Sequence, residues 1–473
     1  MKTDNYRAII LRCLLALCGL WIGFWIIRGA QNIGQPQMEY SEGFMLLNAR
    51  LFASGQWSWQ LPSIPPFNVS FYTPIGFYVL GLVTKVFGES LVVGRALNLS
   101  YMLGCMVMVF LIVRFETKDK MVSLIAAILP MTAVTMIAWS MFIRVDMLAI
   151  LFELVGIYIA LRYLSRWAIF WSIPFFVMAF YTKQSVMAGT VAVTIYLLIK
   201  NRRRGFLFGG VTALTIGGIM AAATWLSHGG FFREIVLYQR TSPTFQSPLA
   251  VVEIVIISLM VYLPEVIMAG TKLKDHPAHL LSIFAVVAFG LNTLTLFHIG
   301  GISNYLFETT LAICILAGLW LADVDIIQNL TLLIASGVFM IVSLYLAMGG
   351  LMGSYLPDKQ YAANCQKAES LISDATYPIL TENAALVLAA GKQIYYEPFV
   401  FNNLAHLGYF NEDILVNDLK SHRVEYVISQ GHLPEKQIQR FDTAVQTAIV
   451  NNYHVILDAA TGQQFGFVVY QVN

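Results

Sequence analysis

Two carboxylates, Glu39 and Glu42, lie three residues apart in the stretch QPQMEYSEGFMLLNARLFASG. Side chains at positions i and i+3 share one face of a helix, so both acids could meet the same ligand. A carboxylate in such a place can act as a general base and take a proton from a hydroxyl group. The pair could equally mark the start of a helix, where acids complement the helix dipole.

Other polar side chains follow at the ends of later apolar segments. Lys183 alone could simply extend to lipid headgroups, and Arg144 with Asp146 could form a local ion pair. Five separate turns with polar groups at a similar depth indicate a shared site, because charge near a membrane is costly. The turns after the first acids are FIRVDM with Arg144 and Asp146, FYTKQS with Lys183 and Gln184, FFREIVLYQR with Arg233 and Arg240, and HIGGISNYLFE with His298, Asn304, Tyr305 and Glu308.

The composition indicates that a lipid bilayer surrounds most of the chain. Of its 473 residues, 58% are hydrophobic and 12% are charged, whereas soluble domains carry about a quarter charged residues. The net charge of +2, with no basic block, argues against nucleic acid as a partner. The five cysteines lack metal-ligand spacing. The N-terminal apolar segment has no small-residue cleavage site, so we expect it to be retained as an anchor.

The apolar segments predict a polytopic α-helical membrane protein. A spanning helix needs roughly 20 apolar residues, and about eleven segments qualify. Segment 71–87 is shorter and rich in Pro, Gly and Tyr, so we expect an interfacial helix there. The predicted spans are 8–27, 90–113, 121–142, 147–163, 167–182, 185–199, 205–227, 250–270, 279–299, 306–322 and 329–349.

Basic residues in the short loops predict the orientation of the chain. VRFETKDK, IKNRRRG and TKLKD fall on one side together with Lys2 and Arg7, which makes that side cytoplasmic. The N-terminus is then cytoplasmic, and loops 28–89 and 228–249 face outward. With an odd number of spans, residues 350–473 also lie outside. We therefore expect a multi-pass protein of the cell membrane, in contact with membrane lipids.

After residue 350 the sequence becomes polar and predicts a small extracytoplasmic α/β domain. Short apolar runs of the strand type alternate with amphipathic segments of the helix type. The predicted division is a membrane part, 1–349, with 28–89 as its first outer loop, and a domain 350–473. The expected strands are ALVLA, QIYYEPF, VEYVIS, YHVILDAA and FGFVVYQV, and the expected helices are NEDILVNDLKSHR and EKQIQRFDTAVQTAIVNN.

Acids beside basic groups at one membrane face suit a lipid-linked phosphate substrate. Lys and Arg neutralise phosphate oxygens, and a carboxylate can deprotonate an acceptor hydroxyl that attacks the anomeric carbon of a sugar. The leaving group would be a polyprenyl phosphate, whose developing charge the cations stabilise. A single displacement of this kind inverts the configuration of the sugar.

The first outer loop resembles that of the polytopic GT-C glycosyltransferases. These include the protein O-mannosyltransferases, the aminoarabinose transferases of lipid A and related bacterial enzymes of the family 39 type. The resemblance rests on MEYSEGFMLLNARLFASGQW, on the Pro-Tyr segment that follows, and on FG-x-S-x-x-x-x-R at Phe87, Gly88, Ser90 and Arg95. It implies a GT-C fold, a polyprenyl-phosphate sugar donor and a lipid, glycan or protein acceptor. It also implies a possible divalent metal ion at Glu39 and Glu42.

The resemblance also assigns expected roles to residues. A bacterial subgroup reads Asp-Tyr-Gly-Glu-Gly where residues 39–43 stand here, so Glu39 takes the place of the presumed catalytic Asp. Its side chain is one methylene longer, which leaves open whether Glu39 or Glu42 is the base. The expected catalytic residues are Glu39, Glu42 and Asp146, the donor phosphate ligands are Lys183, Arg144, Arg95 and Arg240, and further candidates are Gln184, Tyr72, Asn304, Tyr305 and Glu308.

Three other interpretations compete with an active transferase. A transporter or flippase of lipid-linked saccharides would favour internal repeats, broken helices and polar groups near the bilayer midplane. An O-antigen ligase or polymerase would carry a large basic outer loop late in the chain. A catalytically silent relative would keep the fold without a working base.

Overall fold

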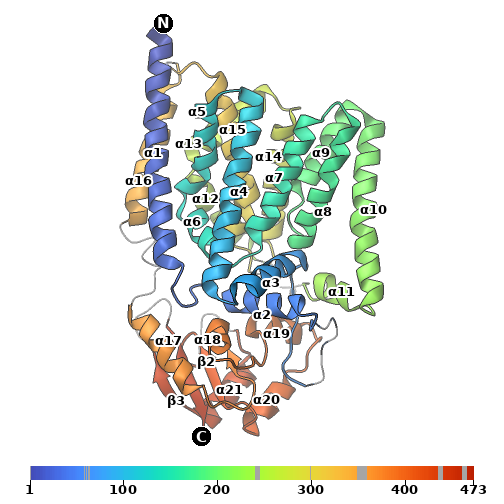
Figure 1. The fold of residues 1–473 in the computed structure, drawn as a ribbon, viewed down its shortest axis with the longest axis vertical. Helices are drawn as coiled ribbons and strands as arrows, with labels where there is room; N and C mark the ends of the chain where they lie inside the picture. The colour runs from blue at the N-terminus through green and yellow to red at the C-terminus, as the bar shows by residue number, and fades with distance from the viewer. Residues whose placement is uncertain are drawn as a thin grey trace.

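A bundle of helices is stacked on a smaller α/β part in the computed structural model (Figure 1). The N-terminus lies at the far end of the bundle and the C-terminus at the far end of the α/β part. The structure describes residues 2–57, 59, 61, 64–239, 246–298, 300–326, 328–348, 359–434, 440–460 and 466–473.

Every segment predicted as a span contains one or more helices of the bundle. The helices are α1 (Lys2–Asn32), α4 (Leu91–Thr117), α5 (Lys120–Ile128), η1 (Leu129–Thr132), α6 (Val134–Met141), α7 (Asp146–Arg162), η2 (Trp167–Ser172), α8 (Ile173–Thr182), α9 (Ala188–Lys200), α10 (Arg202–Leu226), α12 (Pro248–Met260), α13 (Leu263–Asp275), α14 (Leu280–Leu296), η4 (Ser303–Leu306), α15 (Phe307–Asp323) and α16 (Leu330–Leu346). Two short helices, α11 (Gly230–Phe232) and η3 (Arg233–Leu237), follow α10.

Two predicted spans are bent. Helices α12 and α13 meet at 94°, and α5 with η1 meets α6 at 82°. Pro264 lies in the first turn of α13, where its missing N–H costs nothing. Within the described residues, four helices are long and apolar enough to cross a membrane, or six if each bent pair is one span. The total of about eleven includes shorter apolar helices and stays a prediction.

Two helices lie across the end of the bundle, next to the α/β part (Figure 1). They are α2 (Glu42–Ala53) and α3 (Ile75–Phe87), and α3 falls in the segment expected to be interfacial. They approach so closely that a Cβ at Gly81 would lie 2.4 Å from the Ala49 carbonyl oxygen. After α3, Gly88 adopts φ 92°, which favours glycine, and the Ser90 hydroxyl caps α4. The FG-x-S motif is thus the turn that starts α4.

The α/β part contains a four-stranded sheet of order β1-β2-β4-β3. β1 (Leu380–Thr381) pairs parallel with β2 (Tyr426–Ser429), and β4 (Val468–Val472) runs antiparallel to β2 and to β3 (Tyr453–Asp458). The helices are α17 (Lys359–Leu371), α18 (Ala384–Ala389), α19 (Pro398–His406), α20 (Asp413–Lys420) and α21 (Thr443–Asn452).

The predicted strands VEYVIS, YHVILDAA and FGFVVYQV contain β2, β3 and β4, but two other strand predictions are wrong. ALVLA forms helix α18, because Asn383 caps it by accepting a hydrogen bond from the Leu386 N–H. QIYYEPF makes only an isolated bridge at Ile394 before α19 begins at Pro398. Short apolar runs fit a buried strand and a buried helix equally well.

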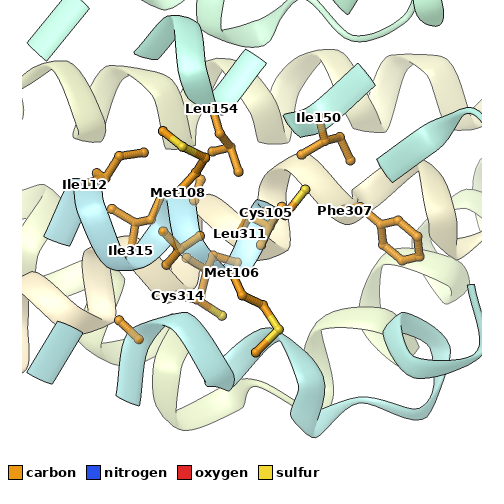
Figure 2. Packing of buried hydrophobic residues seen from close by; sticks show 14 of the residues in the cluster. Cys105, Met106, Met108, Ile112, Ile150, Leu154, Phe307, Leu311, Cys314 and Ile315 are labelled. Carbon is orange, nitrogen blue, oxygen red and sulfur yellow. The ribbon is translucent and has the colours of Figure 1, made fainter. Parts of the chain in front are cut away.

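Apolar side chains of α4, α7 and α15 meet in the middle of the bundle (Figure 2). Cys105 and Ile112 of α4, Leu154 of α7 and Leu311 of α15 are fully or nearly fully buried there. This packing fixes the three helices that carry Arg95, Asp146 and Glu308 near their N-terminal ends. The close-packed core therefore holds the polar residues at those ends in fixed positions.

Candidate functional site

Glu42 and Arg95, both predicted site residues, are paired with each other. The guanidinium donates to both carboxylate oxygens, over 2.8 Å from Nε and 2.7 Å from Nη2. The side chains are 0% and 1% exposed, respectively. Glu42 also accepts the backbone N–H of Met38 at 2.9 Å, and Arg95 donates to the carbonyl of Asn32 at 3.0 Å. The pair therefore binds the first outer loop to the start of α4 and faces no open space.

Glu39 lies in a different environment, at the edge of a cavity. Its side chain is 22% exposed. One carboxylate oxygen accepts the Ser41 N–H at 2.9 Å and the Ser41 hydroxyl at 2.5 Å. The other lies 3.4 Å from Nη1 of Arg144. Glu39 thus keeps partial access to solvent while Arg144 and Ser41 orient it.

Arg144 connects Glu39 to three other polar residues. It precedes α7, donates to the Ser41 hydroxyl, and donates from Nη2 to the Tyr72 hydroxyl at 3.1 Å. Its Nε lies 3.5 Å from a carboxylate oxygen of Asp146, the first residue of α7. Arg144 therefore bridges the acid of the first loop and the acid of the second.

Asp146 in turn holds Lys183, which follows the last residue of α8. The Lys183 ammonium donates to Asp146 over 2.7 Å, and the Asn304 amide donates to the same oxygen over 2.8 Å. The ammonium also lies 4.3 Å from the centre of the Tyr305 ring. The continuous chain Glu39–Arg144–Asp146–Lys183 thus alternates acid and base and collects residues from three separate turns.

A mainly apolar cavity of about 370 Å³ lies at the Lys183 end of this chain. Gln184 lines it and donates to the Phe71 carbonyl at 2.8 Å. The other lining residues are Tyr72, Lys183, Ser185, Gln239, Leu294, Thr295, Phe297, His298 and Tyr305. The cavity presents the Lys183 ammonium and the Tyr72 phenol beside apolar side chains. This combination suits a lipid that has an anionic headgroup and a hydrocarbon chain.

A second cavity, of about 240 Å³, lies at the Glu39 end. Six of its lining residues come from the helical part and six from the α/β part. They are Gln37, Met38, Glu39, Tyr40, Trp139 and Phe142, and then Tyr361, Asn383, Gln430, Arg440, Gly466 and Phe467. The chain of ionic contacts therefore has a cavity at each end.

The α/β part brings charged residues to Glu39 that the sequence did not indicate. Arg440 stacks 3.9 Å from the centre of the Tyr40 ring and lies 3.2 Å from Glu382. Burial, and then the negative charge of Glu39, raise the pKa of the Glu397 carboxyl to about 8. Burial likewise raises the pKa of the Tyr72 phenol to about 12, against the charge of Arg144. At neutral pH both groups keep their protons.

Glu308 lies behind Lys183 and does not join the ionic chain directly. Its carboxylate accepts from the Asn292 amide at 2.7 Å and from the Ala188 N–H at 3.4 Å. Glu153 accepts from the neighbouring Gly189 N–H at 2.7 Å. These contacts attach α15 and α7 to the start of α9, and α15 to α14. Arg240, the remaining predicted phosphate ligand, lies outside the described residues.

The arrangement does not fit a metal ion shared by Glu39 and Glu42. Arg95 engages both oxygens of Glu42, and Arg144 and Ser41 engage Glu39. Where side chains are described, no group of three or more His, Cys, Asp or Glu residues could hold a metal ion.

Residues 72–228 match the family model described as dolichyl-phosphate-mannose-protein mannosyltransferase. This segment includes Tyr72, Arg95, Arg144, Asp146 and Lys183 but not Glu39. A comparison with curated proteins gives no significant match.

The fold is similar to that of solved membrane glycosyltransferases. ArnT from Cupriavidus metallidurans bound to undecaprenyl phosphate has a TM-score of 0.63 at 13% identity, over 96% of this chain and 97% of that one. Its apo state gives 0.64 at 12%, over 99% and 98%. The oligosaccharyltransferase AglB from Archaeoglobus fulgidus, with an inhibitory peptide and a dolichol-phosphate, gives 0.50 at 12%, over 89% and 69%. These matches confirm that the chain resembles GT-C glycosyltransferases in its fold.

Proposed function

From the GT-C membrane fold, we propose that this chain is an inverting glycosyltransferase with a polyprenyl-phosphate sugar donor. It moves the sugar to a hydroxyl group of an acceptor. The observation that carries the proposal is the ionic chain from Glu39 to Lys183, with a cavity at each end. The undecaprenyl phosphate bound by ArnT and the dolichol-phosphate bound by AglB support a lipid phosphate as the carrier.

The donor belongs in the cavity at Lys183. The ammonium there is a cation for a phosphate oxygen, and Asp146 and Asn304 hold it in place. The Tyr72 phenol accepts a hydrogen bond from Arg144, so its own O–H can donate to the phosphate. Leu294 and Phe297 supply carbon surface for the first isoprene units.

The acceptor belongs in the cavity at Glu39, where the carboxylate acts as general base. The acceptor oxygen bonds to the anomeric carbon as the bond from that carbon to the phosphate oxygen breaks. Glu39 takes the hydroxyl proton, and the phosphate leaves with the electron pair. Lys183 and Arg144 stabilise its charge. Attack opposite the leaving group inverts the anomeric centre.

Glu42, Arg95 and Asp146 act as positioning residues in this proposal. Glu42 and Arg95 shape the loop that carries Glu39, because their contacts extend from Asn32 to Ile143. Asp146 holds Lys183 and lies 3.5 Å from Arg144, so it sets the spacing of the two cations.

The site lies on the outer face of the membrane in this proposal. The positive-inside rule puts the N-terminus in the cytoplasm, and α1 and the first loop then bring Glu39 to the opposite side. The α/β part is stacked at that end of the bundle (Figure 1), which makes it extracytoplasmic. Membrane lipids surround the helices, and the donor reaches its cavity from the bilayer.

Binding of undecaprenyl phosphate to the purified protein tests the donor site. Lys183→Gln removes one charge-assisted hydrogen bond, worth about 1.5–3 kcal/mol, so the dissociation constant should rise about ten- to a hundredfold. Lys272→Gln is the matched control, because Lys272 pairs with Asp323 at the far end of α15. It should bind as the wild type does.

Lys183→Gln alone leaves Asp146 without its closest cation, so the variant could fail to fold. A double variant with Asp146→Asn removes that unpaired charge and should fold without regaining affinity. A wild type that binds no polyprenyl phosphate, or binds it equally well without Lys183, would contradict the proposal. The transporter interpretation, which the two bent helix pairs would suit, would then take its place.

A further inference from the structure

The cavity at Glu39 is lined by residues of both the helical part and the α/β part. Its volume of about 240 Å³ far exceeds the roughly 10–15 Å³ that one water molecule needs on the same measure. Gln430 follows strand β2 and Phe467 precedes β4, so the ends of the two central strands face Glu39 across it. An acceptor bound there would touch both parts at once.

The lining combines aromatic rings with amide side chains. Aromatic rings can pack against the C–H faces of a sugar ring, and amides can both donate to and accept from hydroxyl groups. Such a mixture of apolar walls with a few directed polar groups is typical of small-molecule sites. The aromatic residues are Tyr40, Trp139, Phe142, Tyr361 and Phe467, and the amides are Gln37, Asn383 and Gln430.

The charges of the lining are compensated within the protein. Arg440 forms an ion pair with Glu382, whose side chain is 7% exposed, and stacks on Tyr40. Glu39 is paired with Arg144. A phosphate or carboxylate acceptor would have to desolvate its charge beside Glu39 with no uncommitted cation among the described lining residues. A neutral acceptor meets no such cost.

The placement of the cavity also bears on a peptide acceptor. An extended peptide commonly binds by adding a strand to a free sheet edge. The cavity lies at the ends of β2 and β4, which are the two inner strands of the sheet. A peptide therefore has no free strand to pair with at this cavity, and the side chains that line it suit a compact ligand instead.

We infer that the acceptor presents a neutral, hydroxyl-rich sugar unit, held between Glu39 and the side chains of Gln430 and Arg440. This inference rests on the proposed function and adds the class of acceptor to it. Arg440 pairs its charge with Glu382 and also donates to the Gln430 side-chain oxygen. The remaining N–H groups of these two side chains donate to hydroxyl groups of the sugar, and one hydroxyl lies against Glu39.

Donor consumption in the presence of defined acceptors tests the inference. The donors are undecaprenyl-phosphate hexoses and pentoses, and the acceptors are neutral methyl glycosides, the matching sugar phosphates and a Thr-containing peptide. Neutral glycosides should raise donor consumption above the acceptor-free rate, while sugar phosphates and the peptide should not. Stimulation by phosphates or peptide only, or by no acceptor while the donor is hydrolysed, would overturn the inference.

Variants of the α/β part separate binding from chemistry. Gln430→Ala removes one or two hydrogen bonds to the acceptor, worth about 0.5–1.5 kcal/mol each, so its KM should rise about three- to tenfold with a smaller change in kcat. Arg440→Gln combined with Glu382→Gln avoids an unpaired Glu382 and should raise KM similarly. Arg423→Gln is the matched control, because that side chain is 70% exposed and pairs with Asp418 outside the cavity lining.

An unchanged acceptor KM in both Gln430→Ala and the double variant would overturn the inference. A wild type that neither binds nor consumes any polyprenyl-phosphate donor would instead overturn the proposed function, and the acceptor inference with it. Acceptor-free donor hydrolysis distinguishes the two failures, because it requires the donor site alone.

Discussion

At the residue scale, Glu39 and Glu42 differ in what surrounds their carboxylates. Glu42 accepts two hydrogen bonds from the buried Arg95 guanidinium and further ones from backbone N–H groups. Glu39 borders a cavity and is held by Arg144 and Ser41. A base must reach an acceptor hydroxyl, so the geometry favours Glu39 for that role and Glu42 for stabilising the loop.

Glu42→Gln should therefore lower stability more than it affects chemistry. Removing one partner of a buried ion pair typically costs about 3–5 kcal/mol, because the remaining charge stays buried. We expect a clearly lower melting temperature, which a second change, Arg95→Met, should partly restore. Thermal unfolding in detergent measures this, with Glu39→Gln as the partly exposed control. A Glu42→Gln protein that melts normally but has lost turnover would instead identify Glu42 as the base.

Glu397 should make stability depend on pH. Its pKa is about 8 in the folded state, against an ordinary value of 4.5, because of burial and the charge of Glu39. Between these values the unfolded state has lost the proton and the folded state keeps it, so this group lowers stability as pH rises toward 8. Above that pH both states are ionised and the effect levels off.

Glu397→Gln removes the ionisation, so the variant should gain stability relative to the wild type as pH increases. The difference in melting temperature should be larger near pH ~8.5 than near pH ~5.5. Asp275→Asn changes an exposed acid of α13 and should give no such trend. A constant difference between Glu397→Gln and wild type at all pH values would contradict the raised pKa.

Much of the ionic chain was predictable residue by residue, since Glu39, Arg144, Asp146, Lys183 and Asn304 follow apolar segments that end at one face. The local pair of Arg144 and Asp146 could be read from their spacing. The pairing of Glu42 with Arg95 was not predictable, because Arg95 lies 53 residues after Glu42. Arg440 and Glu397 were missed for the same reason. They belong to a polar segment in which charged residues are common, and only the tertiary fold brings them to Glu39.

At the element scale, α2 links the two parts of the molecule. Its N-terminal turn packs on α18, and a Cβ at Gly43 would lie 2.1 Å from the Ala385 backbone nitrogen. That nitrogen donates to the Gln37 side chain at 2.8 Å, one of the contacts that attach the α/β part to the first loop. The small size of Gly43 is thus required for this approach.

Gly43→Ala should weaken the contact between α2 and α18. Overpacking of this kind costs about 1–3 kcal/mol, and we expect faster limited proteolysis of the α/β part together with a lower melting temperature. Gly34→Ala is the control, because a Cβ there meets nothing within 4 Å. Wild-type proteolysis of the Gly43→Ala protein would show that the two helices can separate freely.

The sequence predicted the positions of the helices better than their shapes. Long apolar segments such as α1, α4 and α10 are unmistakable, since few other structures bury so much carbon surface. The bends in α12–α13 and α5–α6 depend on local caps, prolines and neighbouring helices, which hydropathy does not report. The strand prediction for ALVLA was wrong, because the Asn383 cap stabilises a helix at this position.

At the scale of the whole molecule, one ionic chain lies between a cavity within the helical part and a cavity that the helical and α/β parts share. In the proposed function, a lipid-linked donor enters the first cavity from the bilayer and a polar acceptor enters the second from the aqueous side. Arg144 donates to Glu39, which lines one cavity, and to Tyr72, which lines the other, so it connects the two cavities. The proposed function thus gives the carrier lipid and the acceptor separate cavities.

The most direct test of this account is donor turnover by purified wild type and Glu39→Gln, measured alongside binding of undecaprenyl phosphate. The wild type should release undecaprenyl phosphate from a sugar-linked donor. Glu39→Gln should bind the lipid and melt as the wild type does, yet turn over about 10²–10⁴-fold more slowly, because the general base is gone. Equal turnover by the two proteins would contradict the central claim that Glu39 is the catalytic base.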